Sequence, residues 1–237
     1  GFFHPQLPDE PLIFVEVALL SAMADAIAPL IDKRSAPLGS DHFKVAVFYS
    51  ISNCQPGLRN VSLGNFLIKR VADELKRELP QLKTFCTLSP IPGLMGWLTR
   101  VQGFDGVAGT KTAQVEEANT ALALLHKACD GDLGMLTHAG TLQALPATAH
   151  QALWRLAAWY LVRLSPTAGG DPVARFHLDN GARLERLNAN ANLASKGLKQ
   201  SAGLMVNYLY ELSRIESCHE QFVSGRVVHS RALSALL

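Results

Sequence analysis

Apolar residues follow two different spacings in the first third of the chain. Residues 12–20 (LIFVEVALL) follow Pro11 and are rich in β-branched and aromatic side chains, which predicts a β-strand. Residues 44–51 form a second, largely apolar run, which predicts a strand buried on both faces. Across residues 62–79 the apolar positions instead recur at helical spacing, with charged residues between them. This pattern predicts an amphipathic helix, which Pro80 ends.

Further segments extend this pattern to a fold class. Residues 83–88 and the apolar run at 203–210 (GLMVNYLY) are predicted strands. A strand, a helix and a strand in this order predict a right-handed βαβ unit, so we expect the α/β class. Residues 1–11 are expected to be an irregular lead-in, and residues 22–31 a short helix or turn that ends near Pro29.

The middle of the chain has a different character. Residues 102–110 are rich in glycine and are interpreted as a flexible linker. Residues 112–127 and 145–164 are rich in Ala and Leu and are predicted helices. We interpret residues 111–165 as a helical insertion that packs against the core of a single domain.

Composition and charge narrow the class of protein. The chain has 237 residues, 48% of them hydrophobic, which suits one large domain or one domain with an insertion. A net charge of +2 without a run of Lys or Arg argues against nucleic acid as a partner. The four cysteines are scattered, which argues against a disulfide framework or a zinc site and fits a reducing compartment. With neither a membrane-length apolar run nor a secretion signal, we expect a cytoplasmic protein without a membrane partner.

The loop at residues 55–65 joins a predicted strand to a predicted helix. Gly57 and Gly64 allow a ligand to approach the backbone closely. The guanidinium of Arg59 can form paired hydrogen bonds with a phosphate, and Ser62 can cap the helix. A helix N-terminus after such a loop binds anions readily, so the loop indicates a phosphate-bearing ligand. It matches neither GxxxxGK[ST] nor GxGxxG, which argues against ATP and dinucleotides. The alternative is a loop that only connects two elements.

Two further residues are candidates for chemistry. Ser89 ends a predicted buried strand, just before the turn Pro-Ile-Pro-Gly. We expect this turn to direct the Ser89 side chain out of the end of the sheet, where α/β proteins bind their ligands. The alternative for Ser89 is a turn serine bonded to its own backbone. His177 lies in Phe-His-Leu-Asp-Asn-Gly, and its alternative is a structural histidine. No two histidines have the spacing of metal ligands, so no metal site is expected.

Several segments together resemble the malonyl-CoA decarboxylase family. They occur in order and lie at both ends of the chain: EPLIFVEVAL (10–19), FYSISNCQPGLRNVSLGNFLIKRV (48–71), LSPIPG (88–93), DPVARFHLDNGARLERLN (171–188) and KGLKQSAGLMVNYLY (196–210). The resemblance implies a fold like that of the Gcn5-related N-acetyltransferases, a mixed β-sheet flanked by helices whose strands splay apart to admit coenzyme A. It also implies that residues 1–237 are one catalytic domain and that the helical domain preceding it in the family is absent. A homo-oligomer is possible.

The resemblance further implies an activity and its residues. The activity is conversion of malonyl-CoA to acetyl-CoA and CO2 by a carboxy-lyase that needs no metal or organic cofactor. Ser89 matches the catalytic serine, described as a proton acceptor, and His177 the catalytic histidine, described as a proton donor. The substrate-binding segment of the family matches Arg59, Asn60, Val61, Ser62, Leu63, Gly64 and Asn65. Ser89 and His177 are expected to bind substrate as well.

Two other functions stay open at this stage. An acyl-CoA acyltransferase fits the same fold, but it needs an acceptor site and often a base, and we find no separate carboxylate for that role. A coenzyme A-binding domain without activity is the second alternative. The presence of both Ser89 and His177 argues against it.

Overall fold

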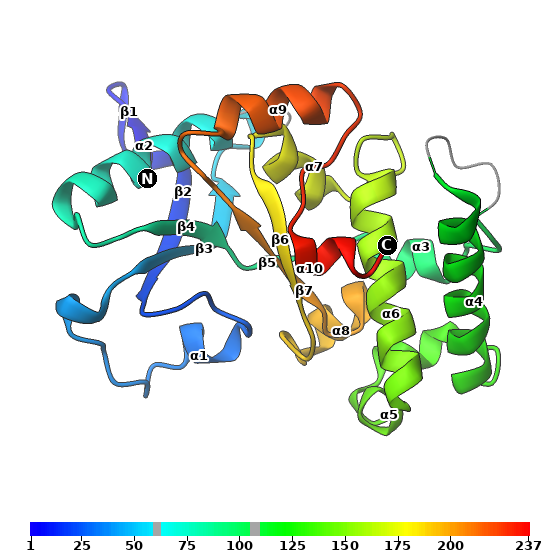
Figure 1. The fold of residues 1–237 in the computed structure, drawn as a ribbon. Helices are drawn as coiled ribbons and strands as arrows, with labels where there is room; N and C mark the ends of the chain where they lie inside the picture. Colours follow the sequence, from blue (N-terminus) through cyan, green and yellow to red (C-terminus); the bar gives the residue numbers. More distant parts are fainter. Residues whose placement is uncertain (59–62, 105–109) are drawn as a thin grey trace.

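Strands far apart in the sequence form one mixed β-sheet, seven-stranded in the part of the chain that the structure describes (Figure 1). The structure is a computed structural model that describes residues 1–58, 63–104 and 110–237, without the side chains of residues 63–66. The strand order is β1-β2-β3-β4-β7-β5, and β6 also pairs with β7. The β3–β4 pair is parallel and the other pairs are antiparallel. The predicted α/β class, with a mixed sheet flanked by helices, is confirmed.

The strands confirm four of the predicted runs and correct one expectation. Their bounds are β1 Phe2–His4, β2 Leu7–Leu20, β3 Val45–Asn53, β4 Thr84–Thr87, β5 Ser89–Pro90, β6 Arg183–Asn188 and β7 Met205–Leu209. The irregular lead-in expected at residues 1–11 is wrong, because β1 and the start of β2 pair as an antiparallel hairpin. Pro8 and Pro11 lie in the part of β2 before Ile13, which pairs with β1 but not with β3, and a missing backbone donor is tolerated on such an unpaired side.

The helices flank the sheet and also gather beyond one end of it (Figure 1). Their bounds are α1 Ala28–Ile31, α2 Leu63–Glu78, α3 Leu94–Leu98, α4 Thr112–Ala128, α5 Ala139–Ala144, α6 Ala147–Trp159, α7 Pro172–Asp179, α8 Ser195–Ser201, α9 Ile215–Val223 and α10 Arg231–Ser234. The predicted helices at 62–79 and 112–127 are confirmed as α2 and α4. The third predicted helix is α6 followed by a π-helical segment, Tyr160–Leu164. The expectation that a helix ends near Pro29 is wrong, because proline is favoured in the first turn and α1 begins there.

The parallel strands β3 and β4 separate partway along their length. Residues Val45–Phe48 pair with Thr84–Thr87, and the Leu88 N–H donates to the Phe48 carbonyl at 3.1 Å. Beyond that point β3 continues to Asn53 alongside β2, whereas Ser89 pairs with Val206 of β7. The chain after β4 therefore turns away from β3. As a result, the end of β3 and the strand β5 lie apart. The resemblance led us to expect such a splayed pair.

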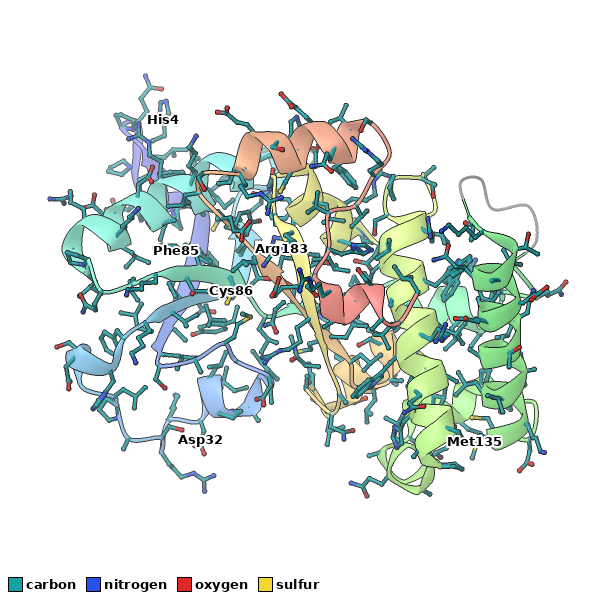
Figure 2. The ribbon with its side chains drawn as sticks, viewed as in Figure 1. His4, Asp32, Phe85, Cys86, Met135 and Arg183 are labelled. Atoms are coloured by element: carbon teal, nitrogen blue, oxygen red, sulfur yellow. The ribbon has the colours of Figure 1, made fainter. Side chains whose placement is uncertain are left out.

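One hydrophobic cluster joins the sheet to the helices of residues 112–164. It contains Ala46 and Phe48 of β3 together with Leu125 of α4 and Leu156 of α6, all of them buried. Figure 2 shows Phe85 and Cys86 in the middle of the sheet, and Met135 among the helices at the other end of the molecule. These helices thus share buried contacts with the sheet.

In the described residues, we find no helix that combines the length and the apolar character needed to cross a lipid bilayer.

Candidate active site

A pocket of about 540 Å³ lies where β3 and β5 diverge. The first half of its wall comes from β2 and β3, and the second from β5, α7 and α8. Its lining residues are Ile13, Phe48, Tyr49, Ser50, Ile51, Asn53, Ser89, Pro90, Pro172, Val173, Phe176, His177 and Lys196. Most of these side chains are apolar. Ser89, His177 and Lys196 contribute a hydroxyl, an imidazole and an ammonium group to the same pocket.

Ser89 is held at the inner end of this pocket by the sheet. Its backbone pairs with Val206 of β7, and the residue is only 5% exposed. Its hydroxyl donates a hydrogen bond to Thr87 Oγ1 at 2.9 Å and lies 3.0 Å from His177 Nε2. The structure therefore brings together two candidates that are 88 residues apart in the sequence.

His177 lies on α7 and is enclosed by aromatic side chains. Its ring stacks on Tyr208, with ring centroids 4.6 Å apart, and meets Phe176 edge to face at 5.0 Å. Its Nδ1 is 2.8 Å from the hydroxyl of Tyr210. Burial lowers the pKa of His177 to about 3, because the apolar surroundings disfavour the charged imidazolium. His177 is therefore neutral at neutral pH.

Asp171 connects the turn after Ser89 to the helix that carries His177. Its Oδ2 accepts a hydrogen bond from the Gly93 N–H at 2.8 Å. Its Oδ1 accepts hydrogen bonds from the Val173 and Ala174 N–H groups, both at 3.0 Å, and so caps α7. One buried carboxylate thereby sets the position of both catalytic candidates. Burial raises the pKa of Asp171, and the three N–H donors oppose that shift.

Gly93 is required by the same close packing. A Cβ atom at Gly93 would lie 2.2 Å from the Tyr160 hydroxyl and 3.2 Å from Asp171 Oδ2. Both neighbours are buried, so neither can move away freely. The glycine therefore lets the turn after Ser89 lie directly against Asp171.

The predicted substrate-binding segment is only partly covered by the described residues. The residues Arg59, Asn60, Val61 and Ser62 lie outside them. The backbone of Leu63, Gly64 and Asn65 forms the first turn of α2, and their side chains lie outside the description. The role of this segment stays a prediction.

Sequence reasoning missed Asp171, Thr87, Tyr210 and Lys196. Asp followed by Pro before a helix is a recognised N-cap signal, and it could have found Asp171. Tyr208 and Tyr210 are two residues apart in an apolar strand segment, which places them on one face of the sheet. No comparable local signal marks Thr87 or Lys196.

Among the described residues, no group of three or more His, Cys, Asp or Glu side chains is arranged to hold a metal ion.

The neutral state of His177 predicts an acid-dependent stability. The folded-state pKa of about 3 lies below the ordinary value of 6.5, so below pH 6.5 the unfolded chain binds a proton that the folded chain does not. The free energy of unfolding should therefore fall by about 1.4 kcal/mol per pH unit from this residue as the pH drops below 6.5. Urea unfolding of the wild type and of His177→Gln between pH 7.5 and 4.5 measures the difference. A difference between the two proteins that stays constant with pH would contradict the assignment.

Comparisons with known proteins agree on one family. Residues 1–237 match the family model described as "Malonyl-CoA decarboxylase C-terminal domain". The mitochondrial malonyl-CoA decarboxylases of Anser anser anser and Rattus norvegicus are 37% and 39% identical over 227 and 221 residues, which is 89% of this chain and 44% of each relative. The crystal structures of malonyl-CoA decarboxylase from Rhodopseudomonas palustris and Cupriavidus metallidurans each match with a TM-score of 0.79. Their identities are 46% and 43%, over 100% of this chain and 52% and 58% of theirs. The chain spans about half the length of these relatives.

Proposed function

Because the chain belongs to the malonyl-CoA decarboxylase family, we propose that it converts malonyl-CoA into acetyl-CoA and CO2. The observation that carries this proposal is the buried Ser89–His177 pair, 3.0 Å apart, at the inner end of the pocket between β3 and β5. The apolar walls of that pocket suit the reaction, since a poorly solvated carboxylate loses CO2 more readily.

The proposed reaction needs a hydrogen-bond donor and a proton source. The bond between C2 and the carboxylate carbon breaks, and CO2 leaves. The electron pair of that bond moves onto the thioester carbonyl to form an enolate. Donors that point at the developing oxyanion stabilise it, and a proton delivered to C2 completes acetyl-CoA. In this proposal His177 supplies the donor and passes its N–H proton to C2, and it then regains a proton that comes from solvent. Ser89 orients the malonyl carboxylate or relays a proton with His177. The chemistry balances without a metal or an organic cofactor.

The coenzyme A moiety is assigned to the unit of β3, the loop after it and α2. The supporting observation is that α2 begins at Leu63, directly after the segment 59–62. The first N–H groups of a helix have no partner within the helix and favour a pyrophosphate. The acyl end would then reach Ser89 along the wall that Phe48–Ile51 contributes to the pocket.

One assay tests the proposed function. The 237-residue chain is incubated with malonyl-CoA and no acyl acceptor, and CO2 and acetyl-CoA are followed with time. We expect both products in equal amounts. Acyl transfer that occurs only after an amine is added would replace the proposal with an acyltransferase. Binding of malonyl-CoA without turnover would replace it with a binding domain.

Lys196 offers a second test of the substrate. Lys196 is exposed. Among the described residues that line the pocket, it carries the positive charge, because His177 is neutral. We expect Lys196→Met to raise KM for malonyl-CoA about five-fold with little change in kcat, because an exposed ion pair with the malonyl carboxylate contributes modestly to binding. Lys196→Arg keeps the charge and serves as the matched control. Acetyl-CoA lacks the carboxylate, so its inhibition constant should not change. An equal loss of affinity for both thioesters would instead place Lys196 at a phosphate.

We also propose a reducing compartment such as the cytoplasm. All four cysteines, Cys54, Cys86, Cys129 and Cys218, are free thiols, and three of them are buried. Dispersed free cysteines are usual where thiols are kept reduced.

A further inference from the structure

A chain of hydrogen bonds runs beside the pocket from Tyr210, the residue after β7, to Thr87 at the end of β4. The hydroxyl of Tyr210 lies 2.8 Å from His177 Nδ1, and His177 Nε2 lies 3.0 Å from Ser89 Oγ. Ser89 then donates to Thr87 Oγ1 at 2.9 Å, which also accepts the Tyr208 backbone N–H at 3.2 Å. Each histidine nitrogen therefore faces one hydroxyl group, and the position of the imidazole proton depends on which hydroxyl donates.

The Tyr210 end of this chain settles the direction of its own bond. Burial raises the pKa of Tyr210 far above its usual value, so the phenol keeps its proton. A buried O–H group needs an acceptor, and among the described residues the partner within hydrogen-bond distance of this hydroxyl is His177 Nδ1. The phenol therefore donates to Nδ1. Because His177 is neutral and carries one N–H, its proton is on Nε2.

The Ser89 end is compatible with this tautomer. A serine hydroxyl rotates and can both donate and accept, and Thr87 Oγ1 lies 2.9 Å from Ser89 Oγ. Ser89 Oγ can therefore accept the Nε2–H of His177 across their 3.0 Å contact while its own hydrogen points at Thr87. The Tyr210 end places the proton on Nε2, the nitrogen on the Ser89 side of the pocket.

We propose that Tyr210 is a positioning residue that holds His177 as the Nε2–H tautomer. This inference rests on the proposed function for its consequence: the neutral ring presents a donor where the enolate oxygen forms and holds a proton for C2. In the other tautomer, a lone pair on Nε2 would face the oxyanion and repel it. The Tyr210 backbone N–H donates to the Phe85 carbonyl at 2.8 Å, so the residue stays anchored if its hydroxyl is removed.

Tyr210→Phe tests this role, because it removes the hydroxyl and keeps the ring. We expect kcat to fall about two- to five-fold, in proportion to the fraction of molecules that carry the proton on the wrong nitrogen, while KM changes little. A residue that only filled space would not produce this split between kcat and KM. Retention of the wild-type kcat would overturn the proposal.

Nitrogen-15 NMR of histidine-labelled protein reads the tautomer without any turnover. In the wild type we expect a protonated Nε2 and an unprotonated Nδ1 for His177, whose signals are assigned by their loss in His177→Gln. In Tyr210→Phe the two signals should move toward a mixture of tautomers. Tyr208→Phe keeps the stacked ring and removes a hydroxyl that makes no bond to His177, so the two shifts should stay in place.

The two readouts separate the proposals. A proton on Nδ1 in the wild type would overturn the tautomer assignment, even if Tyr210→Phe failed to fold. The expected NMR pattern in a chain that does not decarboxylate malonyl-CoA would leave the tautomer standing and reject the proposed function.

Discussion

His177→Gln should lower kcat for malonyl-CoA by about 10³-fold, and Ser89→Ala by about 10²-fold or more. In the proposed reaction the histidine change has the larger effect, because His177 would supply both the donor at the oxyanion and the proton for C2. Ser89 lies 3.0 Å from His177 Nε2 and is bonded to Thr87, so its loss frees the ring to move and removes one polar group from the pocket. Steady-state rates of CO2 release measure both variants.

Controls separate chemistry from folding. His42 is an exposed histidine outside the pocket, so His42→Gln should keep the wild-type rate. Binding of acetyl-CoA to both site variants reports whether the pocket survives. The double variant should be little slower than His177→Gln alone, because residues that act as one unit are not additive. Turnover at the wild-type rate in either single variant would reject the residue assignment.

Asp171→Ala should be the most destabilising single change at the site. It leaves the backbone N–H groups of Gly93, Val173 and Ala174 without their acceptor, and it removes the N-cap of α7. We expect the free energy of unfolding to fall by about 2–4 kcal/mol, from the lost cap and the buried donors left unpaired. Urea unfolding at pH 7.5 measures the loss. Asp132→Ala is the matched control. Asp132 is exposed and caps the short 3₁₀ helix Leu133–Thr137 through one hydrogen bond from the Gly134 N–H, so its loss should cost about 1 kcal/mol or less.

Asp171→Ser divides the two tasks of this carboxylate. A serine hydroxyl can cap α7, but it is too short to reach the Gly93 N–H as well. We expect this variant to recover about 1 kcal/mol of stability relative to Asp171→Ala, yet to keep a low kcat, because the turn after Ser89 is no longer tied to α7. Wild-type turnover in Asp171→Ser would show that the link to Gly93 does not position Ser89.

Local sequence patterns were sufficient for elements whose apolar residues follow a regular spacing within one continuous segment. The helical spacing at 62–79 and the apolar runs at 12–20, 44–51 and 203–210 correspond to α2, β2, β3 and β7. The hairpin of β1 with β2 was not predicted, because residues 1–11 carry no run of apolar residues, and the hairpin forms by pairing Phe2–His4 with residues 7–13. The same limit applied to Asp171, whose cap signal is local but whose bond to Gly93 spans 78 residues.

The sequence by itself determined which chemical groups are available and where each stands on its element. It placed Ser89 directly after an apolar strand, although the structure shows Ser89 as the first residue of β5, and the resemblance pointed to both Ser89 and His177. Only the tertiary structure decided that they lie 3.0 Å apart, that Tyr210 faces the other imidazole nitrogen, and that burial keeps the ring neutral. The reason is physical: periodicity, caps and turns depend on neighbours in the chain, whereas desolvation and hydrogen bonds between β5, α7 and β7 exist only once those segments have been packed together.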